Sequence, residues 1–163
     1  IDDDSSPEIV SDFYAVMGDL LHQKGREREA YAAYDSCLQW KPDNIGCLNN
    51  YAYFLSVQGK RLDEAEQMSQ KTVKAEPKNP TYLDTYAWIL FMQQRYVEAR
   101  IYIDQALQND STPSSVEREH AGDIYFMCGE TEKALDYWQQ ALQDDPQNKL
   151  LARKIKRKKY IKQ

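Results

Sequence analysis

Glycine and proline are scarce in this sequence, with six of each among 163 residues. An all-β domain needs a tight turn about every 8 to 12 residues, and such turns rely on these two residue types. The shortage therefore favours a mainly helical fold. The remaining composition, 42% hydrophobic and 29% charged, is that of a chain that folds around a core and not of a disordered chain.

Long apolar runs are also missing. No stretch approaches the about 18 uninterrupted apolar residues of a membrane-spanning helix, and no charged-then-apolar leader opens the chain. We therefore expect a soluble segment that does not insert into a membrane. Because the first residue is Ile1 and not methionine, we expect a piece of a longer protein. Its compartment stays open: cytoplasmic by default, or periplasmic if a leader precedes residue 1.

Residues for catalysis and metal binding are few. Cys37, Cys47 and Cys128 have unrelated spacings and no CxxC pair, which argues against a disulfide framework or a zinc site. Of the two histidines, His22 is expected to face solvent and His120 to contact a neighbouring helix. Phosphate-binding loops, a GxSxG elbow and an HExxH motif are all absent. The sequence thus predicts no catalytic residue, no cofactor and no metal, and therefore no enzyme.

The basic residues are unevenly distributed. Residues 149–163 hold eight of the 21 Lys and Arg residues and no acid, so the other 13 stand against all 26 Asp and Glu residues, a net charge of −13. Such a body repels phosphate, which argues against a nucleic-acid partner. In the basic tail, Leu150, Leu151 and Ile155 recur at helical spacing. We predict a helix over residues 147–160 that docks on the helix before it and caps the fold.

A repeat of 34 to 35 residues runs through the body. Its clearest mark is an alanine at spacings of 35, 34 and 35, namely Ala30, Ala65, Ala99 and Ala134. About twelve residues earlier stands a second small residue, Gly18, Ala52, Ala87 or Gly122. Small side chains are needed where two helices approach closely, so the pattern predicts four helix pairs.

These positions resemble the tetratricopeptide repeat family, and in particular its bacterial-type members. The 34-residue unit of this family carries W-x2-L-G-x2-Y on its first helix and A-x3-F on its second, followed by proline. The first unit, for example, places Tyr14, Gly18 and Leu21 on one helix and Ala30 and Tyr34 on the next. The resemblance implies an all-α fold, a right-handed α-solenoid of four helix-turn-helix units and a C-terminal capping helix. The expected segments are an acidic N-terminal segment (1–10), four units (11–44, 45–79, 80–114 and 115–146) and the basic capping helix (147–163). First helices are expected at 11–24, 45–58, 80–93 and 115–128, and second helices at 27–39, 62–75, 96–109 and 131–143.

The resemblance also implies a binding surface, because the first helices of this family line a concave groove that holds a peptide or a partner helix. At the groove positions stand acidic, polar, aromatic and methionine side chains, and neither lysine nor arginine. The candidate peptide-binding residues are Asp19, Asn49, Tyr53, Asp84, Trp88, Phe91, Met92, Glu119, Asp123, Phe126 and Met127. This composition suits a protein or peptide that carries basic residues around an apolar anchor.

Two functions remain open on this basis. One is a non-catalytic protein–protein interaction scaffold that binds its partner in the groove. The alternative is a structural C-terminal part of a longer repeat array, packed on its own missing N-terminal region. Exposed aromatic surface near Trp88 would favour the first, and an uncapped apolar face on the first unit would favour the second.

Overall fold

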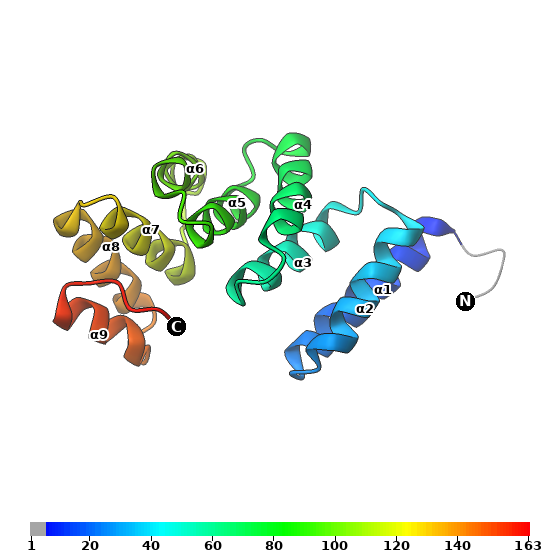
Figure 1. Ribbon diagram of the computed structural model, residues 1–163, viewed down its shortest axis with the longest axis horizontal. Helices are drawn as coiled ribbons and strands as arrows, with labels where there is room; N and C mark the ends of the chain where they lie inside the picture. Colours follow the sequence, from blue (N-terminus) through cyan, green and yellow to red (C-terminus); the bar gives the residue numbers. More distant parts are fainter. Residues whose placement is uncertain (1–5) are drawn as a thin grey trace. The chain divides into compact units, whose positions relative to one another are not determined.

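The computed structural model describes residues 6–163, and within this range the chain forms nine helices and no strand (Figure 1). It divides into two compact units between Ala75 and Glu76. The first unit holds α1 (Pro7–Gln23), α2 (Glu27–Trp40), α3 (Ile45–Val57) and α4 (Leu62–Ala75). The second holds α5 (Pro80–Met92), α6 (Tyr96–Gln108), α7 (Ser115–Met127), α8 (Thr131–Asp144) and α9 (Lys149–Arg157). Every predicted helix is present, with its ends within four residues of the prediction.

The largest difference lies at the start of α1. Residues 1–5 of the expected acidic segment lie outside the described residues, and from Pro7 onward that segment is helical. Proline suits the first helical position, because its fixed φ matches the helix and no N–H bond is lost there. Val10 is buried on this extension, which ties the additional turn to the rest of the unit.

Side-chain caps start four of the helices. Asn44, Asn79, Ser114 and Asn148 each accept a hydrogen bond from a backbone N–H of the first turn. Between paired helices, Gly25, Gly59 and Gly129 take positive φ. The third turn has no glycine, and Gln94 adopts the left-handed conformation there with a φ of 63°. These caps and turns lie at the observed helix boundaries.

The small residues of the repeat lie where helices meet. Ala30, Ala65, Ala99 and Ala134 are all fully buried. A Cβ on Gly18 would lie 2.5 Å from Cε1 of Tyr34, and a Cβ on Gly122 would lie 2.2 Å from Cδ1 of Trp138. At these two positions an aromatic ring rests on the backbone, so only glycine fits.

The last helix packs against the end of the second unit. α9 contacts α8, and its Leu151 is fully buried, while Leu150 and Ile155 are half-buried. The helix is shorter than predicted because Lys158 takes a left-handed conformation with a φ of 54°. From there the chain turns back along α9 (Figure 1).

Candidate functional site

The predicted groove residues of the second unit come together on α5 and α7. Nδ1 of His120 lies 2.8 Å from Oδ1 of Asp84, and the His120 ring stacks on Trp88 with ring centroids 4.1 Å apart. Trp88 stacks in turn on Phe91 at 4.5 Å. Trp88 is only 8% exposed and Phe91 only 4%, so this pair packs between repeats and does not form an open aromatic wall.

The environment of His120 favours the charged imidazole. Burial alone lowers the pKa of His120, but the Asp84 carboxylate, with Asp123 and Glu119 beyond it, outweighs burial and raises that pKa above its ordinary value. A protonated His120 donates to Asp84 and presents its ring face to Trp88. The contacts of His120 with Asp84 and Trp88 on α5 confirm the expected contact with a neighbouring helix.

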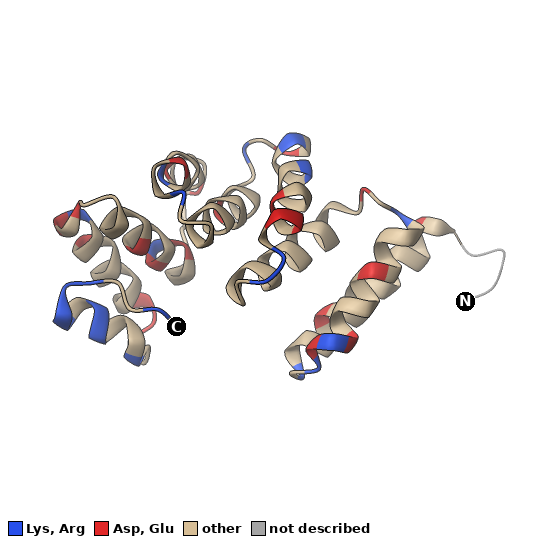
Figure 2. Ribbon diagram, in the orientation of Figure 1, with Lys and Arg blue, Asp and Glu red and all other residues tan. Residues whose placement is uncertain are grey.

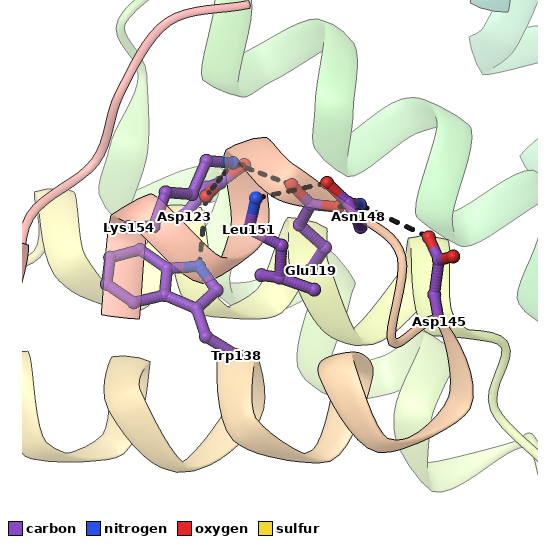
Figure 3. Close-up of polar contacts among 7 residues, drawn as sticks. All are labelled: Glu119, Asp123, Trp138, Asp145, Asn148, Leu151 and Lys154. Carbon is purple, nitrogen blue, oxygen red and sulfur yellow. Dashed lines mark hydrogen bonds and ion pairs between the residues drawn. The ribbon is translucent and has the colours of Figure 1, made fainter. Parts of the chain in front are cut away.

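A lysine from α9 fills the acidic part of the same surface (Figure 3). Nζ of Lys154 lies 2.8 Å from Oε2 of Glu119 and 2.8 Å and 3.0 Å from the two carboxylate oxygens of Asp123. Nε1 of Trp138 donates to Oδ1 of Asp123 at 3.0 Å. Lys154 is 3% exposed and Asp123 2%. Of these two candidate groove residues, Asp123 is therefore buried beneath α9 and Glu119 is half-buried beside it.

Burial and the lysine act on Asp123 in opposite directions. Burial raises the pKa of Asp123 to about 6, while the nearby Lys154 ammonium counteracts the rise. At pH 7 the carboxylate is still mainly ionised, so the ion pair with Lys154 is formed. Asn148, the cap of α9, donates to Oε1 of Glu119 at 3.1 Å and joins this network (Figure 3).

Lys154 is not among the predicted site residues, yet the sequence contains a signal for its burial. Lys154 follows Leu151 by three residues, so both lie on the same face of α9. Tyr160 is the other unexpected member of the site. Its ring meets the Phe91 ring edge-on at 5.2 Å, and Nζ of Lys154 lies 5.3 Å from its centroid. Tyr160 belongs to a non-helical segment, where periodicity gives no signal.

The remaining predicted residues of the second unit are half-buried at its edges. Phe126 stacks on Trp138 at 5.9 Å. Met127 lines a surface hollow beside the turn between α5 and α6, together with Arg95 and Tyr96. Met92 is half-buried at the end of α5.

In the first unit, Asp19 makes hydrogen bonds inside the fold, Asn49 is buried and Tyr53 is half-buried. Asp19 accepts hydrogen bonds from the Tyr34 hydroxyl at 2.5 Å and from Nδ2 of Asn50 at 3.1 Å. Asn49 is 5% exposed, and its Oδ1 has no hydrogen-bond partner among residues 6–163. Tyr53 is half-buried, with its ring 5.9 Å from that of Phe54.

The expectation for His22 is wrong. Its ring stacks on Phe54 at 3.5 Å and is half-buried, because α3 lies beside the end of α1. Cys37 is fully buried, as its small-residue position predicts, and all three cysteines are free thiols.

Comparison with known proteins identifies the repeats. Residues 21–89 match a family model described as tetratricopeptide repeat, and residues 119–148 match a second model with the same description. The chain belongs to the tetratricopeptide repeat (TPR) family. It is 37% identical over 68 residues to the TPR repeat-containing protein PA4667 of Pseudomonas aeruginosa, a match that covers 42% of this chain and 12% of that protein. The chain thus spans only a small part of the length of this relative.

Solved structures show the same TPR fold. PilF of Pseudomonas aeruginosa superimposes with a TM-score of 0.78 at 19% identity, covering 94% of this chain and 69% of PilF. PilW, described as a widely conserved type IV pilus biogenesis factor, gives 0.76 at 20% identity, with 91% and 68% covered. YrrB, described as a TPR protein with an unusual peptide-binding site, gives 0.62 at 20% identity, with 82% and 68% covered. The expected all-α solenoid of TPR repeats is confirmed, and this fold is generally that of protein-interaction scaffolds.

One pair of positions joins consecutive TPR repeats in both units. Counted from the predicted repeat starts, the sixth residue of a repeat contacts the ninth residue of the repeat before it. The pairs are Asn50 with Asp19, His120 with Trp88, and Lys154 with Asp123 when α9 is counted as a fifth repeat beginning at Lys149. α9 therefore takes the place of the first helix of a further TPR repeat.

The first TPR repeat has no such neighbour among the described residues. Four large apolar residues of α1 are exposed: Ile9 at 69%, Phe13 at 52%, Val16 at 58% and Leu20 at 52%. We call them the α1 stripe. Phe13 and Val16 occupy the third and sixth repeat positions. At the third position of later repeats, Cys47, Glu117 and Leu151 are buried and Tyr82 is half-buried.

Two kinds of site are not found among residues 6–163. No group of three or more His, Cys, Asp and Glu side chains is placed to hold a metal ion. No helix in this range combines the length and the apolar character that crossing a bilayer requires.

Proposed function

We propose that this chain is a non-catalytic scaffold that binds a basic peptide or partner helix, with an apolar anchor, on the faces of its first helices. The observation that carries the proposal is the position of the Lys154 ammonium group. A lysine from another helix lies on two carboxylates, Glu119 and Asp123, that stand at groove positions. A cationic side chain of a partner would be held at such a face by the same charge-assisted hydrogen bonds.

The first unit has candidate groove residues of its own. Asp19 supplies a carboxylate, and Tyr53 supplies a half-buried aromatic ring. YrrB, a structural neighbour of this chain, is described as a TPR protein with an unusual peptide-binding site.

Fluorescence anisotropy tests the proposal with a labelled lysine-rich peptide that carries one central tyrosine, and with a matched peptide that has glutamate in place of lysine. We expect saturable binding of the lysine peptide that weakens as salt rises from about 0.05 to about 0.5 M. Tyr53→Ala should weaken binding at least about tenfold, as loss of an aromatic anchor does.

Tyr31→Ala is the matched control, because Tyr31 is a half-buried tyrosine of the first unit on the second helix, α2. It should leave the affinity unchanged. Preference for the glutamate peptide, or equal losses in the two tyrosine variants, would contradict binding on the first-helix face.

The α1 stripe favours a second candidate, a structural part of a longer TPR array. Its third and sixth positions are apolar and exposed, whereas Asn50, His120 and Lys154 at the sixth position contact a preceding repeat. The test is a chain in which a copy of residues 80–114 replaces residues 1–10. This copy places a helix pair directly before Ser11, in the same way that α5 and α6 stand directly before Ser115. A higher melting temperature is expected, and Phe13→Asp should abolish the gain. An unchanged melting temperature would contradict the stacking role.

A further inference from the structure

The segment after α9 lies on the aromatic pair of the first-helix face. The chain leaves α9 at Lys158, turns back along the helix (Figure 1) and places the Tyr160 ring on Phe91 at 5.2 Å. Burial raises the pKa of Tyr160 to about 12, so the phenol is neutral and its ring packs as an apolar group. We call residues 158–163 the tail. Its sequence surrounds one aromatic and one aliphatic residue with lysines: Lys158, Lys159, Tyr160, Ile161 and Lys162.

The tail and α9 are attached with different strength. α9 is fixed by the buried Leu151, the Asn148 cap and the ion pairs of Lys154 with Glu119 and Asp123. The tail adds the half-buried ring of Tyr160 and a backbone hydrogen bond from Lys159 to Lys154, while the lysine side chains of the tail are exposed. Release of the tail would therefore uncover Phe91 without undocking α9.

The charges and the aromatic rings around the tail match its sequence. Lys and Arg gather along α9 and the segment after it, whereas acidic residues dominate the rest of the chain (Figure 2). Beneath the Tyr160 ring lies Phe91, which stacks in turn on Trp88 at 4.5 Å and meets Tyr96 edge-on at 5.4 Å. Nearby stand the carboxylates of Glu119 and Asp123. An aromatic residue flanked by lysines matches both the rings and the acidic body.

We propose that the Phe91 surface is a binding site for a lysine-flanked aromatic residue of a partner protein, and that the tail occupies this site within the same chain until the partner displaces it. The inference rests on the proposed function and names the partner chemistry for the second unit. Binding in the second unit would then be a competition, whereas binding at Tyr53 in the first unit would not depend on the tail.

The experiment compares the full chain with a chain that ends at Arg157. The probe is a fluorescently labelled peptide of residues 157–163, and a peptide with Tyr160→Ser is the control. We expect saturable binding to the shortened chain, at least about tenfold weaker binding to the full chain, and no binding of the control peptide. Equal binding to the two chains, or no binding to either, would overturn the proposal.

Two variants separate displacement from damage. Tyr160→Ser in the full chain should reproduce the gain in peptide binding while the melting temperature and helix content stay close to those of the parent. Phe91→Leu in the shortened chain should remove the binding while the helix content is kept. If Tyr160→Ser gives no gain, or if Phe91→Leu binds as well as the parent, the site is not at Phe91.

Light scattering of the full chain decides whether the tail acts within one chain. We expect the molecular mass to be the same for the full chain and for Tyr160→Ser at every concentration. A dimer that Tyr160→Ser dissociates would place the tail on a second copy and overturn the intramolecular contact. Peptide binding that depends on Tyr53 and not on the tail would leave the proposed function standing while this inference fails.

Discussion

The first and fourth repeats contain the same three-residue arrangement and complete it differently. In each, an aromatic ring rests on a glycine, and the polar group of the aromatic side chain donates a hydrogen bond to the aspartate that directly follows this glycine. The residues are Gly18, Tyr34 and Asp19 in the first repeat and, 104 positions later, Gly122, Trp138 and Asp123 in the fourth. Asp19 takes its second hydrogen bond from the neutral amide of Asn50, whereas Asp123 takes an ion pair with Lys154.

Burial explains the difference between the two partners. Asp123 is 2% exposed beneath α9, and a buried carboxylate needs a cation, since the interior dielectric makes an uncompensated charge very costly. Asp19 lies in a less enclosed environment, where a neutral amide suffices. The same repeat position therefore carries a modest hydrogen bond in one repeat and a structural ion pair in the other. The following predictions test that comparison.

The largest effect is expected from Lys154→Ala, which leaves Asp123 buried without its cation. Breaking a buried ion pair in this way costs about 3 to 5 kcal/mol. Asn50→Ala, at the same repeat position, should cost only about 1 kcal/mol, as for one hydrogen bond. Urea unfolding followed by circular dichroism measures both, and equal losses would contradict the distinction between the two partners.

A smaller effect is expected where rings rest on glycine. Gly122→Ala and Gly18→Ala add a methyl group into contact with Trp138 and Tyr34, and overpacking of this kind costs about 1 to 3 kcal/mol. Gly46→Ala is the control, because the nearest side-chain atom to its Cβ lies 3.9 Å away. That change should stabilise α3, by about 0.5 to 1 kcal/mol. Melting temperatures that fall in all three variants would show that ring contact is not the cause.

The first and fourth repeats also differ at the third position, where Phe13 is exposed and Glu117 is buried. This difference is expected to make the unfolding free energy depend on pH. Burial, aided by a hydrogen bond with Asp110, raises the pKa of Glu117 to about 8. The folded state thus holds a proton that the unfolded state releases near its ordinary pKa of about 4.5, so the contribution of Glu117 to stability falls as pH rises from about 5 to 8. Glu117→Gln should reduce this fall and raise the unfolding free energy at pH 9 by on the order of 1 kcal/mol. Denaturant titrations at pH 5, 7 and 9 measure it, and parallel pH profiles for the two proteins would contradict the shifted pKa.

The smallest effect is expected at the sixth position of the first repeat. Val16→Asn alters an exposed side chain and should change the unfolding free energy by less than about 0.5 kcal/mol. His120→Asn, at the same position of the fourth repeat, removes the stacking on Trp88 and the contact with Asp84, and should cost more. If the melting temperature of Val16→Asn falls as far as that of His120→Asn, then Val16 has a contact as important as that of His120.

The helices could be predicted from the sequence because the repeat spacing fixes them. Ala30, Ala65, Ala99 and Ala134 stand at one phase of the repeat, and all are fully buried. The exposure of the groove residues is harder to predict, since some groove positions also contact a neighbouring repeat. Trp88 is at a groove position, but its exposure is decided by His120 of the next repeat, a contact that the spacing within one unit does not show.

The C-terminal part of the site was missed for a different physical reason. In a run of lysines, burial of one ammonium group depends on which carboxylates lie beneath it, and those carboxylates are 31 and 35 residues away in the sequence. The position of Tyr160 depends on the reversal at Lys158, where a non-glycine residue takes a left-handed conformation without any local sequence mark.

The outer side of α9 has a consequence for how copies of this chain meet in solution. Arg153, Lys156 and Arg157 are exposed there, so two molecules that approach through α9 repel each other. The α1 stripe carries no such charge and is adhesive toward apolar surfaces. In a concentrated solution, copies of this chain are therefore expected to associate through the α1 stripe and not through α9. Added salt should weaken the repulsion between α9 helices.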